Sequence, residues 1–224
     1  MPTPGDARRK VQLFLVLTFA RTLEGRHWNN DGVVEGVPEP GKPALRPSPS
    51  TMSPQAEIRP DPPMTNSSSI RWPAEFEPSR CAVYVSNQSE LAVPPERVWE
   101  WLIRATLWPR WYSNAKRVRI LEGSPSELAL GTRFHWWTFK TPITSQVLEF
   151  QPNERLAWDA KGPGVFAYHA WLITPTPTGC HVLTEECQHG LLARLHGLLM
   201  PHDMHDKHQI WLDGLKDSCH GGRA

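Results

Sequence analysis

The sequence predicts an α+β domain over about residues 79–218, with helices covering one face of an antiparallel sheet. Apolar periodicity in that segment indicates a strand, two short helices, a series of strands and a long closing helix, in this order. Eight of the 11 tryptophans lie between Trp99 and Trp171. Large aromatic side chains at this density need either a thick core or a cavity to line, so the sequence predicts one domain with a wide apolar interior.

Residues 1–78 have the composition of an extension without a fold of its own. They hold 13 of the 23 prolines, together with Gly-rich and Ser-rich runs. Such a segment cannot offset its ordering entropy with buried apolar surface. We therefore expect residues 1–78 to be disordered, and residues 219–224 to form a flexible tail.

A short apolar segment near the amino terminus bears on localisation. The stretch from Arg8 to Ala20 resembles a secretory signal, although no small-x-small cleavage site follows it. It is too short to span a bilayer, so we expect no integral membrane insertion. The alternative is an over-extended reading frame that truly starts at Met52 or Met64. We expect a cytoplasmic protein, or a secreted one if the segment acts as a signal.

The first predicted elements are a strand and a helix. The strand is expected within residues 81–93, where Asn87 and Gln88 suggest a bulge. Two prolines then end the strand and favour a helix start, because proline is tolerated at the first helical position. Apolar residues recur at helical spacing over residues 98–105, so this helix buries a wide face. The motif TLWPRWYS predicts a second short helix or turn.

Five or six strands follow, separated by turn signals, and their short connections favour an antiparallel meander. The strands are expected at residues 116–122, 131–139, 143–150, 155–160, 165–173 and 180–188. The segment from Leu191 to about Ser218 reads as a helix that Pro201 would kink. An incompletely filled space between sheet and helix would hold a ligand, because binding pockets are concave and apolar with few polar groups.

Charge and cysteine content exclude several classes. The formal charge is +1 with acidic and basic residues interspersed, so no basic stripe exists to bind nucleic acid. The four cysteines show no CxxC spacing for zinc or redox chemistry, and they are too few for a disulfide framework. We interpret them as reduced thiols, mostly in the core. The oligomeric state is not predictable.

The chain carries a series of motifs: LAVPPERVWEWL, WPRWYSNAKRV, LGTRFHWW, LEFQPNERLAW, YHAWLITPTPTGCHVLTEE and WLDGLK. In this order and spacing they resemble the START-related (SRPBCC) superfamily, and within it the polyketide cyclase/dehydrase and lipid-transport family. The resemblance covers about residues 79–216. It implies a helix-grip fold, in which an antiparallel sheet wraps around a long final helix and leaves a hydrophobic cavity. It does not imply one reaction, because such folds include carriers, receptors and cyclases.

The candidate ligand-binding residues are mostly aromatic. Side chains alternate between the two faces of a strand. Phe134 and Trp136 lie on the face without a charged residue, so we place them toward the cavity. The alternative is that they fill the core and leave no cavity. The full set of predicted lining residues, with the last two contributed by the closing helix, is Trp111, Phe134, Trp136, Trp158, Trp171, Trp211 and Leu215.

The candidate catalytic residues apply only if the protein is an enzyme. His169 shares an inward face with Trp171 and could move a proton near neutral pH, with Tyr168 or Glu186 as its partner. Glu186 shares the parity of apolar residues on the last strand, and Arg133 would stabilise charge. The alternatives are a structural histidine and a solvated strand-end glutamate.

We expect no metal and no cofactor. The run from His202 to His208 alternates histidine and aspartate, but successive i+3 steps rotate around a helix, so a solvated polar face is the default. No HExxH motif, phosphate loop or nucleophile elbow is present.

Three functions therefore compete. The first is binding or transport of a small hydrophobic molecule, such as a lipid, polyketide or aromatic metabolite, in the cavity. The second is an enzyme of the polyketide cyclase or dehydratase type, which needs a positioned base and an oxyanion partner in the same cavity. The third is a scaffold or co-regulator that uses exposed aromatic residues such as Trp137 and Phe139 for protein contacts.

Overall fold

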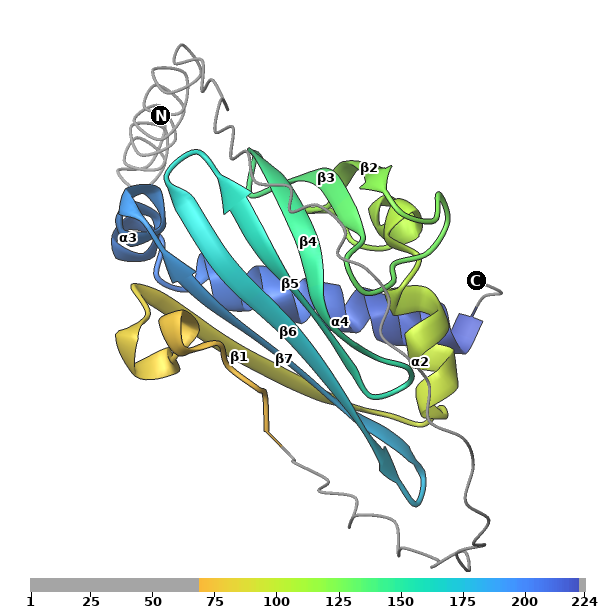
Figure 1. Cartoon of the computed structure of the whole chain (residues 1–224). Helices are drawn as coiled ribbons and strands as arrows, with labels where there is room; N and C mark the ends of the chain where they lie inside the picture. The colour runs from red at the N-terminus through yellow and green to blue at the C-terminus, as the bar shows by residue number, and fades with distance from the viewer. Residues whose placement is uncertain (1–68, 222–224) are drawn as a thin grey trace, which may run out of the picture. The chain divides into compact units, whose positions relative to one another are not determined.

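The computed structural model describes residues 69–221, which contain a seven-stranded antiparallel sheet and a long carboxy-terminal helix (Figure 1). The strands are β1 (Val83–Leu91), β2 (Lys116–Glu122), β3 (Arg133–Thr138), β4 (Thr141–Gln151), β5 (Arg155–Gly162), β6 (Val165–Thr176) and β7 (Gly179–His189). The helices are α2 (Pro95–Leu102), α3 (Leu191–Leu199) and α4 (Asp203–Gly221), with short 3₁₀ helices η1 (Ala74–Phe76), η2 (Pro78–Arg80) and η3 (Ala105–Arg110). The predicted α+β helix-grip architecture is confirmed.

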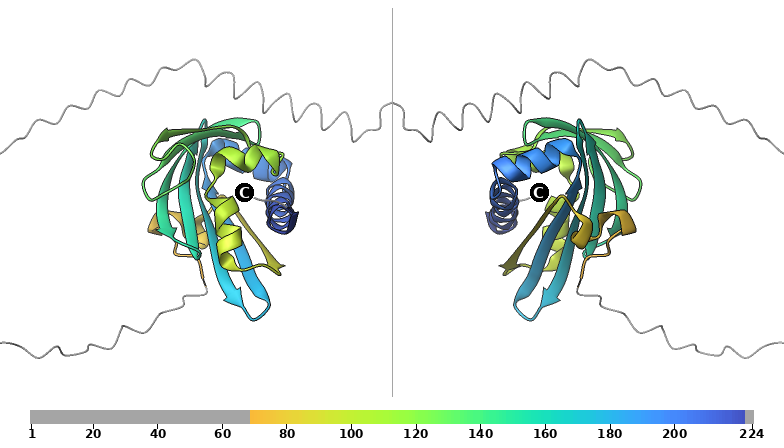
Figure 2. Two further views of the ribbon diagram at one scale, coloured as in Figure 1. Left: turned by 90° about the vertical axis from the view of Figure 1, so that its right-hand side faces the viewer. Right: turned by 90° about the vertical axis from the view of Figure 1, so that its left-hand side faces the viewer.

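The sheet is a meander from β2 to β7, and β1 adds to its far edge beside β7. Figure 2 shows the sheet bending around α4, with α2 on the same concave side. Because side chains alternate along each strand, one set points to the helices and the other to the convex face. The concave face therefore forms the principal core with α2, η3 and α4.

Two details of the strands differ from the sequence-based prediction. The bulge expected at Asn87 and Gln88 is absent, and β1 pairs with β7 without a register shift. Asn87 instead points inward, and its side-chain amide donates to Gln209 Oε1 on α4 at 3.1 Å. Register shifts occur in β2 and in β4 at Val147, where strong curvature is needed.

The closing segment forms two helices rather than one kinked helix. It breaks between α3 and α4 at Pro201, which cannot donate a backbone hydrogen bond. In α4, Gly214 lies against the carbonyl group of Trp111, where a Cβ would overlap the oxygen. A larger residue at this position would push α4 away from the wall of the core.

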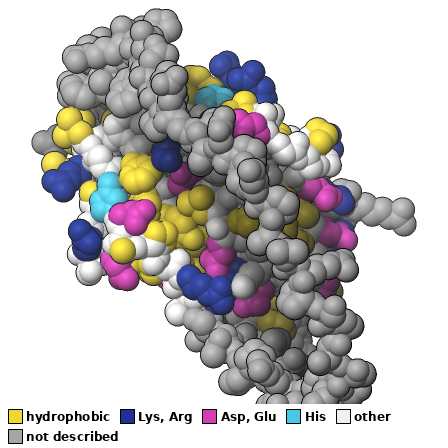
Figure 3. Space-filling model, in the orientation of Figure 1, with side chains coloured by type: hydrophobic (Ala, Val, Ile, Leu, Met, Phe, Trp, Pro, Cys, Tyr) yellow, Lys and Arg dark blue, Asp and Glu magenta, His cyan; other side chains and the backbone are white. Residues whose placement is uncertain are grey.

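The folded domain begins earlier than residue 79. Phe76 is 2% exposed and contacts Tyr168 at 5.7 Å between ring centroids, within a second apolar cluster that also buries Ile70. This cluster lies on the convex face, where the space-filling view shows hydrophobic side chains among charged ones (Figure 3). For residues 69–78 the prediction of a disordered extension is therefore wrong. Residues 219–221, predicted as part of a flexible tail, belong instead to α4, where Cys219 is buried. Residues 1–68, including the signal-like segment, and residues 222–224 lie outside the described residues.

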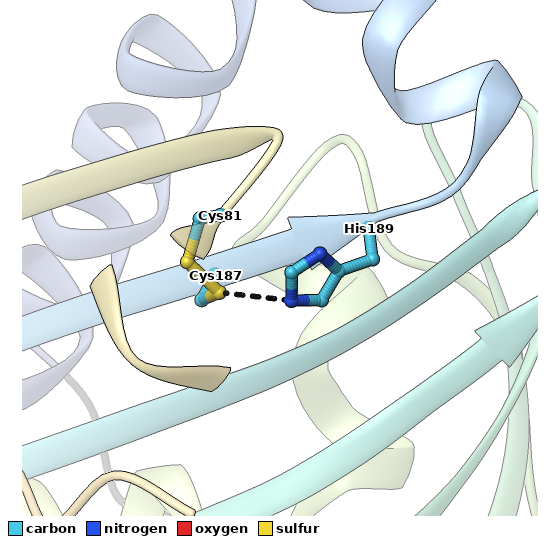
Figure 4. Close-up of side chains that lie close together, drawn as sticks. All are labelled: Cys81, Cys187 and His189. Carbon is cyan, nitrogen blue, oxygen red and sulfur yellow. Dashed lines mark hydrogen bonds between the residues drawn. A yellow bond between two sulfur atoms is a disulfide. The ribbon is translucent and has the colours of Figure 1, made fainter. Parts of the chain in front are cut away.

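A disulfide joins Cys81, just before β1, to Cys187 on β7 (Figure 4). The Cα atoms are 5.5 Å apart although 106 positions separate the residues in sequence. The interpretation of all four cysteines as reduced thiols is therefore wrong for this pair. Cys180 and Cys219 are free and buried, as expected of core thiols. Within residues 69–221, no helix is both long enough and apolar enough to cross a membrane.

The disulfide should contribute measurably to stability, because it restricts the unfolded chain over a long loop. We expect the double variant Cys81→Ser/Cys187→Ser to lose about 2–4 kcal/mol of unfolding free energy, measured by denaturant titration. Dithiothreitol should lower the midpoint of the original protein and leave that of the double variant unchanged. Equal midpoints for the original protein and the double variant, both measured without reductant, would contradict a stabilising disulfide.

Candidate functional site

A cavity lies between the concave face of the sheet, α3 and α4. Its volume is about 60 Å³. Most of its wall is apolar and aromatic, with Trp136, Trp158 and Trp211 among the lining residues, and Leu192 and Ala193 of α3 on one side. Glu186, Gln188, His169 and His208 contribute polar groups to the same wall.

The aromatic wall is held by ring contacts that span the core. Tyr112 stacks on Trp211 with ring centroids 4.4 Å apart and planes at 8°. Trp108 lies beneath, with its ring centroid 5.2–5.5 Å from those of Trp136, Trp158 and Trp211. Such offset and edge-to-face contacts add stability beyond area burial, so the wall is a preformed surface.

The polar groups form one connected cluster centred on the Glu186 carboxylate. Its Oε2 atom lies 3.2 Å from His169 Nδ1 and 3.1 Å from His208 Nε2. Its Oε1 atom accepts a hydrogen bond from Gln188 Nε2 at 2.6 Å. Both carboxylate oxygens are therefore engaged, which a buried carboxylate requires.

The fold explains why these residues meet. His169 on β6 and Glu186 on β7 are direct cross-strand partners, so they project from the same face of adjacent strands. His208 reaches them from α4, and it shares the inward face of that helix with Met204 and Trp211. The cluster therefore depends on the packing of α4 against β6 and β7.

Hydrogen-bond geometry assigns the protons of the cluster. His208 Nδ1 lies 2.8 Å from the Met204 carbonyl oxygen, which only accepts, so Nδ1 carries a proton. The proton between His208 Nε2 and Glu186 is then an additional one, and this pair is neutral as a whole. His169 Nδ1 donates to Glu186, while Nε2 accepts from the Thr184 hydroxyl group at 2.8 Å.

Burial dominates the electrostatics of the site. It lowers the pKa of His169 to about 3, against the attraction of Glu186, so this histidine is neutral at pH 7. Burial also acts against the ionised Glu186 carboxylate, but contacts with His169, His208 and Gln188 together lower its pKa to about 2. Burial raises the pKa of Tyr112 well above its usual value, so its hydroxyl group stays protonated.

Two cavity-lining tryptophans carry buried polar groups without partners. The indole N–H groups of Trp158 and Trp211 make no hydrogen bond within residues 69–221. Trp136, in contrast, donates to the Ser145 hydroxyl group at 3.2 Å. Both nitrogen atoms are enclosed by protein, as are those of Trp101, Trp111 and Trp171, and unpaired buried donors cost free energy.

The predicted ligand-binding residues divide into two groups. Trp136, Trp158 and Trp211 line the cavity. Phe134, Trp171 and Leu215 are 0–1% exposed and pack in the core around it, and Trp111 is half-buried at its edge. Phe134 and Trp136 both point inward, as their parity predicts, but only Trp136 reaches the cavity.

The predicted catalytic residues also divide. His169 and Glu186 meet inside the cavity, so the alternative of a solvated strand-end glutamate is wrong. Tyr168 is adjacent to the inward-facing His169 on β6, so its side chain points to the convex face. There it packs with Phe76. Arg133 forms an ion pair with Glu122 outside the cavity. Neither Tyr168 nor Arg133 can therefore act on a molecule bound there.

Sequence reasoning missed His208, Gln188 and Tyr112. His208 was grouped with its exposed neighbours His202 and His205 as one polar face, although its spacing from Trp211 places both on one side of α4. Trp137 and Phe139, predicted as exposed contact residues, are both half-buried, and Phe139 lines the cavity.

Comparisons with known proteins agree with this architecture. The family model described as polyketide cyclase/dehydrase and lipid transport matches residues 82–219. The crystal structure of a hypothetical protein from Helicobacter pylori is 30% identical, with a TM-score of 0.64; the match covers 70% of this chain and 99% of that one. No curated protein matches this chain significantly.

Two more distant structures share the fold alone. A protein from Thermus thermophilus is 16% identical, with a TM-score of 0.53, and the match covers 61% of this chain and 97% of that one. Truncated norcoclaurine synthase from Thalictrum flavum is 13% identical, with a TM-score of 0.50, and the match covers 63% of this chain and 95% of that one.

Proposed function

Because the chain belongs to the polyketide cyclase/dehydrase and lipid-transport family, we propose that its cavity binds a small molecule with a single aromatic ring and a polar group. The observation that supports this most strongly is the wall of stacked tryptophan and tyrosine side chains beside a buried polar cluster. Burial of an apolar ring against this wall contributes about 25 cal/mol per Å² of apolar surface removed from water.

The size of the cavity favours one of the three ligand classes. The cavity is compact, at about 60 Å³, and holds more than one water molecule. That space suits a single ring with short substituents. We therefore favour a single-ring compound over a long acyl chain or a multi-ring polyketide.

The polar groups restrict the ligand further. The polar groups on the cavity wall favour a molecule that carries a polar atom, such as a phenol or an aromatic carbonyl compound. Glu186 and its partners lie on the same wall and favour a polar substituent over a purely hydrocarbon ligand. Recognition would therefore combine apolar stacking with one or two directed hydrogen bonds.

Tryptophan fluorescence tests this proposal. We expect single-ring phenols or aromatic carbonyl compounds to change the emission saturably, and long-chain fatty acids to leave it unchanged. Replacing Ala160, which lines the cavity, by Leu should weaken binding at least about tenfold, because the added methyl groups occupy ligand space.

The matched control is Lys161→Leu, at the next position of β5, where the side chain is exposed. It should bind as the original protein does. Saturable binding of fatty acids in preference to the aromatic compounds, or equal affinity of the two variants, would refute the proposal.

A second candidate function is acid–base catalysis in the same cavity. The specific observation that favours it is the contact between His169 and Glu186, two residues predicted for proton transfer, within the cavity wall. A carboxylate in contact with two imidazole groups can accept a proton from a bound substrate and return it. The ring closure or water loss of the cyclase/dehydratase type requires such transfers.

This candidate is tested with any aromatic carbonyl compound found to bind. Glu186→Gln keeps the shape of the side chain and removes its capacity to accept a proton. We expect turnover to fall by about 10²–10⁴-fold, the usual contribution of a general base, while ligand affinity changes little. Unchanged product formation by mass spectrometry, or parallel losses of turnover and affinity, would argue against catalysis by Glu186.

A further inference from the structure

Three potential metal-ligand atoms converge at the polar end of the cavity. They are His169 Nδ1, His208 Nε2 and Glu186 Oε2, and all lie within 4.8 Å of one another. Glu186 Oε2 lies 3.2 Å from His169 Nδ1 and 3.1 Å from His208 Nε2. All three side chains are buried, and all three line the cavity.

These separations suit a metal ion as well as they suit hydrogen bonds. Two donor atoms that each lie about 2.1 Å from a tetrahedral zinc ion are about 3.4 Å apart. The observed 3.1 Å and 3.2 Å differ from this value by a few tenths of an ångström. After small side-chain movements, one metal ion could therefore take the place of the protons that now lie between the nitrogen atoms and Glu186 Oε2.

The outer atoms of all three ligands already have partners of the kind that metal sites need. His208 Nδ1 donates to the Met204 carbonyl oxygen at 2.8 Å, so Nε2 is the atom that can bind a metal once its shared proton has left. His169 Nε2 lies 2.8 Å from the Thr184 hydroxyl oxygen, which can accept a hydrogen bond from an Nε2–H group. Gln188 holds the second oxygen of Glu186 at 2.6 Å. Such outer partners orient ligands and set the histidine tautomer.

We propose that His169, Glu186 and His208 form a binding site for one Zn²⁺ ion, with its remaining coordination position open to the cavity. Two histidines and one glutamate with an open position are a ligand set typical of zinc sites that bind a water or a substrate atom. The proposal goes beyond ligand binding by the aromatic wall, which does not require an ion.

Charge and burial favour the ion. Once the proton shared by His208 and Glu186 has left, the three ligands together carry one negative charge in an interior shielded from water, and a divalent cation compensates it. On binding, His169 would move its remaining proton to Nε2, facing Thr184, and the proton between His208 and Glu186 would be released.

A second group of possible ligands, Cys81, Cys187 and His189, does not compete. Its two sulfur atoms are joined in the disulfide (Figure 4). His189 Nε2 lies 2.9 Å from the Glu75 carbonyl oxygen, so it carries a proton rather than a free lone pair. The oxidised protein therefore offers one buried candidate site within the described residues.

The test uses the full chain, freed of any affinity tag, stripped with EDTA and kept oxidised. ZnCl₂ is added in competition with a chromophoric chelator, and Co²⁺ is added separately as a spectroscopic substitute. We expect one equivalent of Zn²⁺ per chain, a raised melting temperature, and a Co²⁺ visible spectrum of nitrogen and oxygen ligands without thiolate bands.

Variants then locate the ion. Glu186→Gln and His208→Gln should each weaken Zn²⁺ binding more than about 100-fold, and Thr184→Val should weaken it about 10–100-fold, the usual cost of losing an outer partner. His205→Gln, an exposed histidine on the same helix, and His189→Gln should bind as the original protein does. Far-UV circular dichroism checks folding, and Thr184→Val keeps the test valid if a ligand variant unfolds.

The proposal is overturned if the original protein takes up no stoichiometric Zn²⁺ at micromolar concentrations, or if Glu186→Gln and His208→Gln bind it unchanged. If either result is obtained and aromatic ligands still alter the tryptophan fluorescence, the metal site is rejected and the proposed ligand binding is retained. Zn²⁺ uptake without any aromatic ligand binding would support the metal site and reject the proposed ligand binding.

Discussion

The structure depends on the burial of one carboxylate. Glu186 lies on the concave face of the sheet, under α4, where an unpaired charge would cost more free energy than the domain could supply. His169 beside it, His208 from α4 and Gln188 on its own strand satisfy its oxygens. The carboxylate thus links β6, β7 and α4 through specific contacts, whereas the remaining core is held by non-directional apolar packing.

The same arrangement leaves the interior incompletely filled. Polar side chains at the centre of the concave face cannot be packed over by aromatic rings without losing hydrogen-bond partners, so the rings of Tyr112, Trp158 and Trp211 stand around them. Small residues such as Ala160 and Ala167 keep the space between open. The outcome is a small cavity with an apolar wall and one polar end.

Local patterns predicted the frame of this domain. The alternation from Lys116 to Glu122 coincides with β2, and the parity of Glu186 correctly placed it inward. Features that arise only between distant segments were not predictable. The disulfide partners lie 106 positions apart, and the packing of Phe76 on the convex face depends on a strand that follows much later. A proline-rich context therefore concealed a segment that folds.

His208 illustrates a different limit. It lies in a run of histidines and aspartates whose exposed members dominate the pattern, so the run reads as a solvated face. Its true environment follows from the orientation of α4, which tertiary packing sets rather than composition. The size of the cavity has the same origin, because a difference of one methyl group on several strands decides whether the interior is solid or hollow.

The central claim is that Glu186 is held between two buried histidines, and the most direct measurement is a long-range ¹H–¹⁵N NMR spectrum of the histidine side chains in metal-free protein. We predict that His169 is neutral, with its proton on Nδ1, and stays so down to about pH 4, because burial lowers its pKa to about 3. We also predict a proton on Nδ1 of His208. A His169 signal that titrates near pH 6.5, as a solvated imidazole does, would contradict the buried cluster.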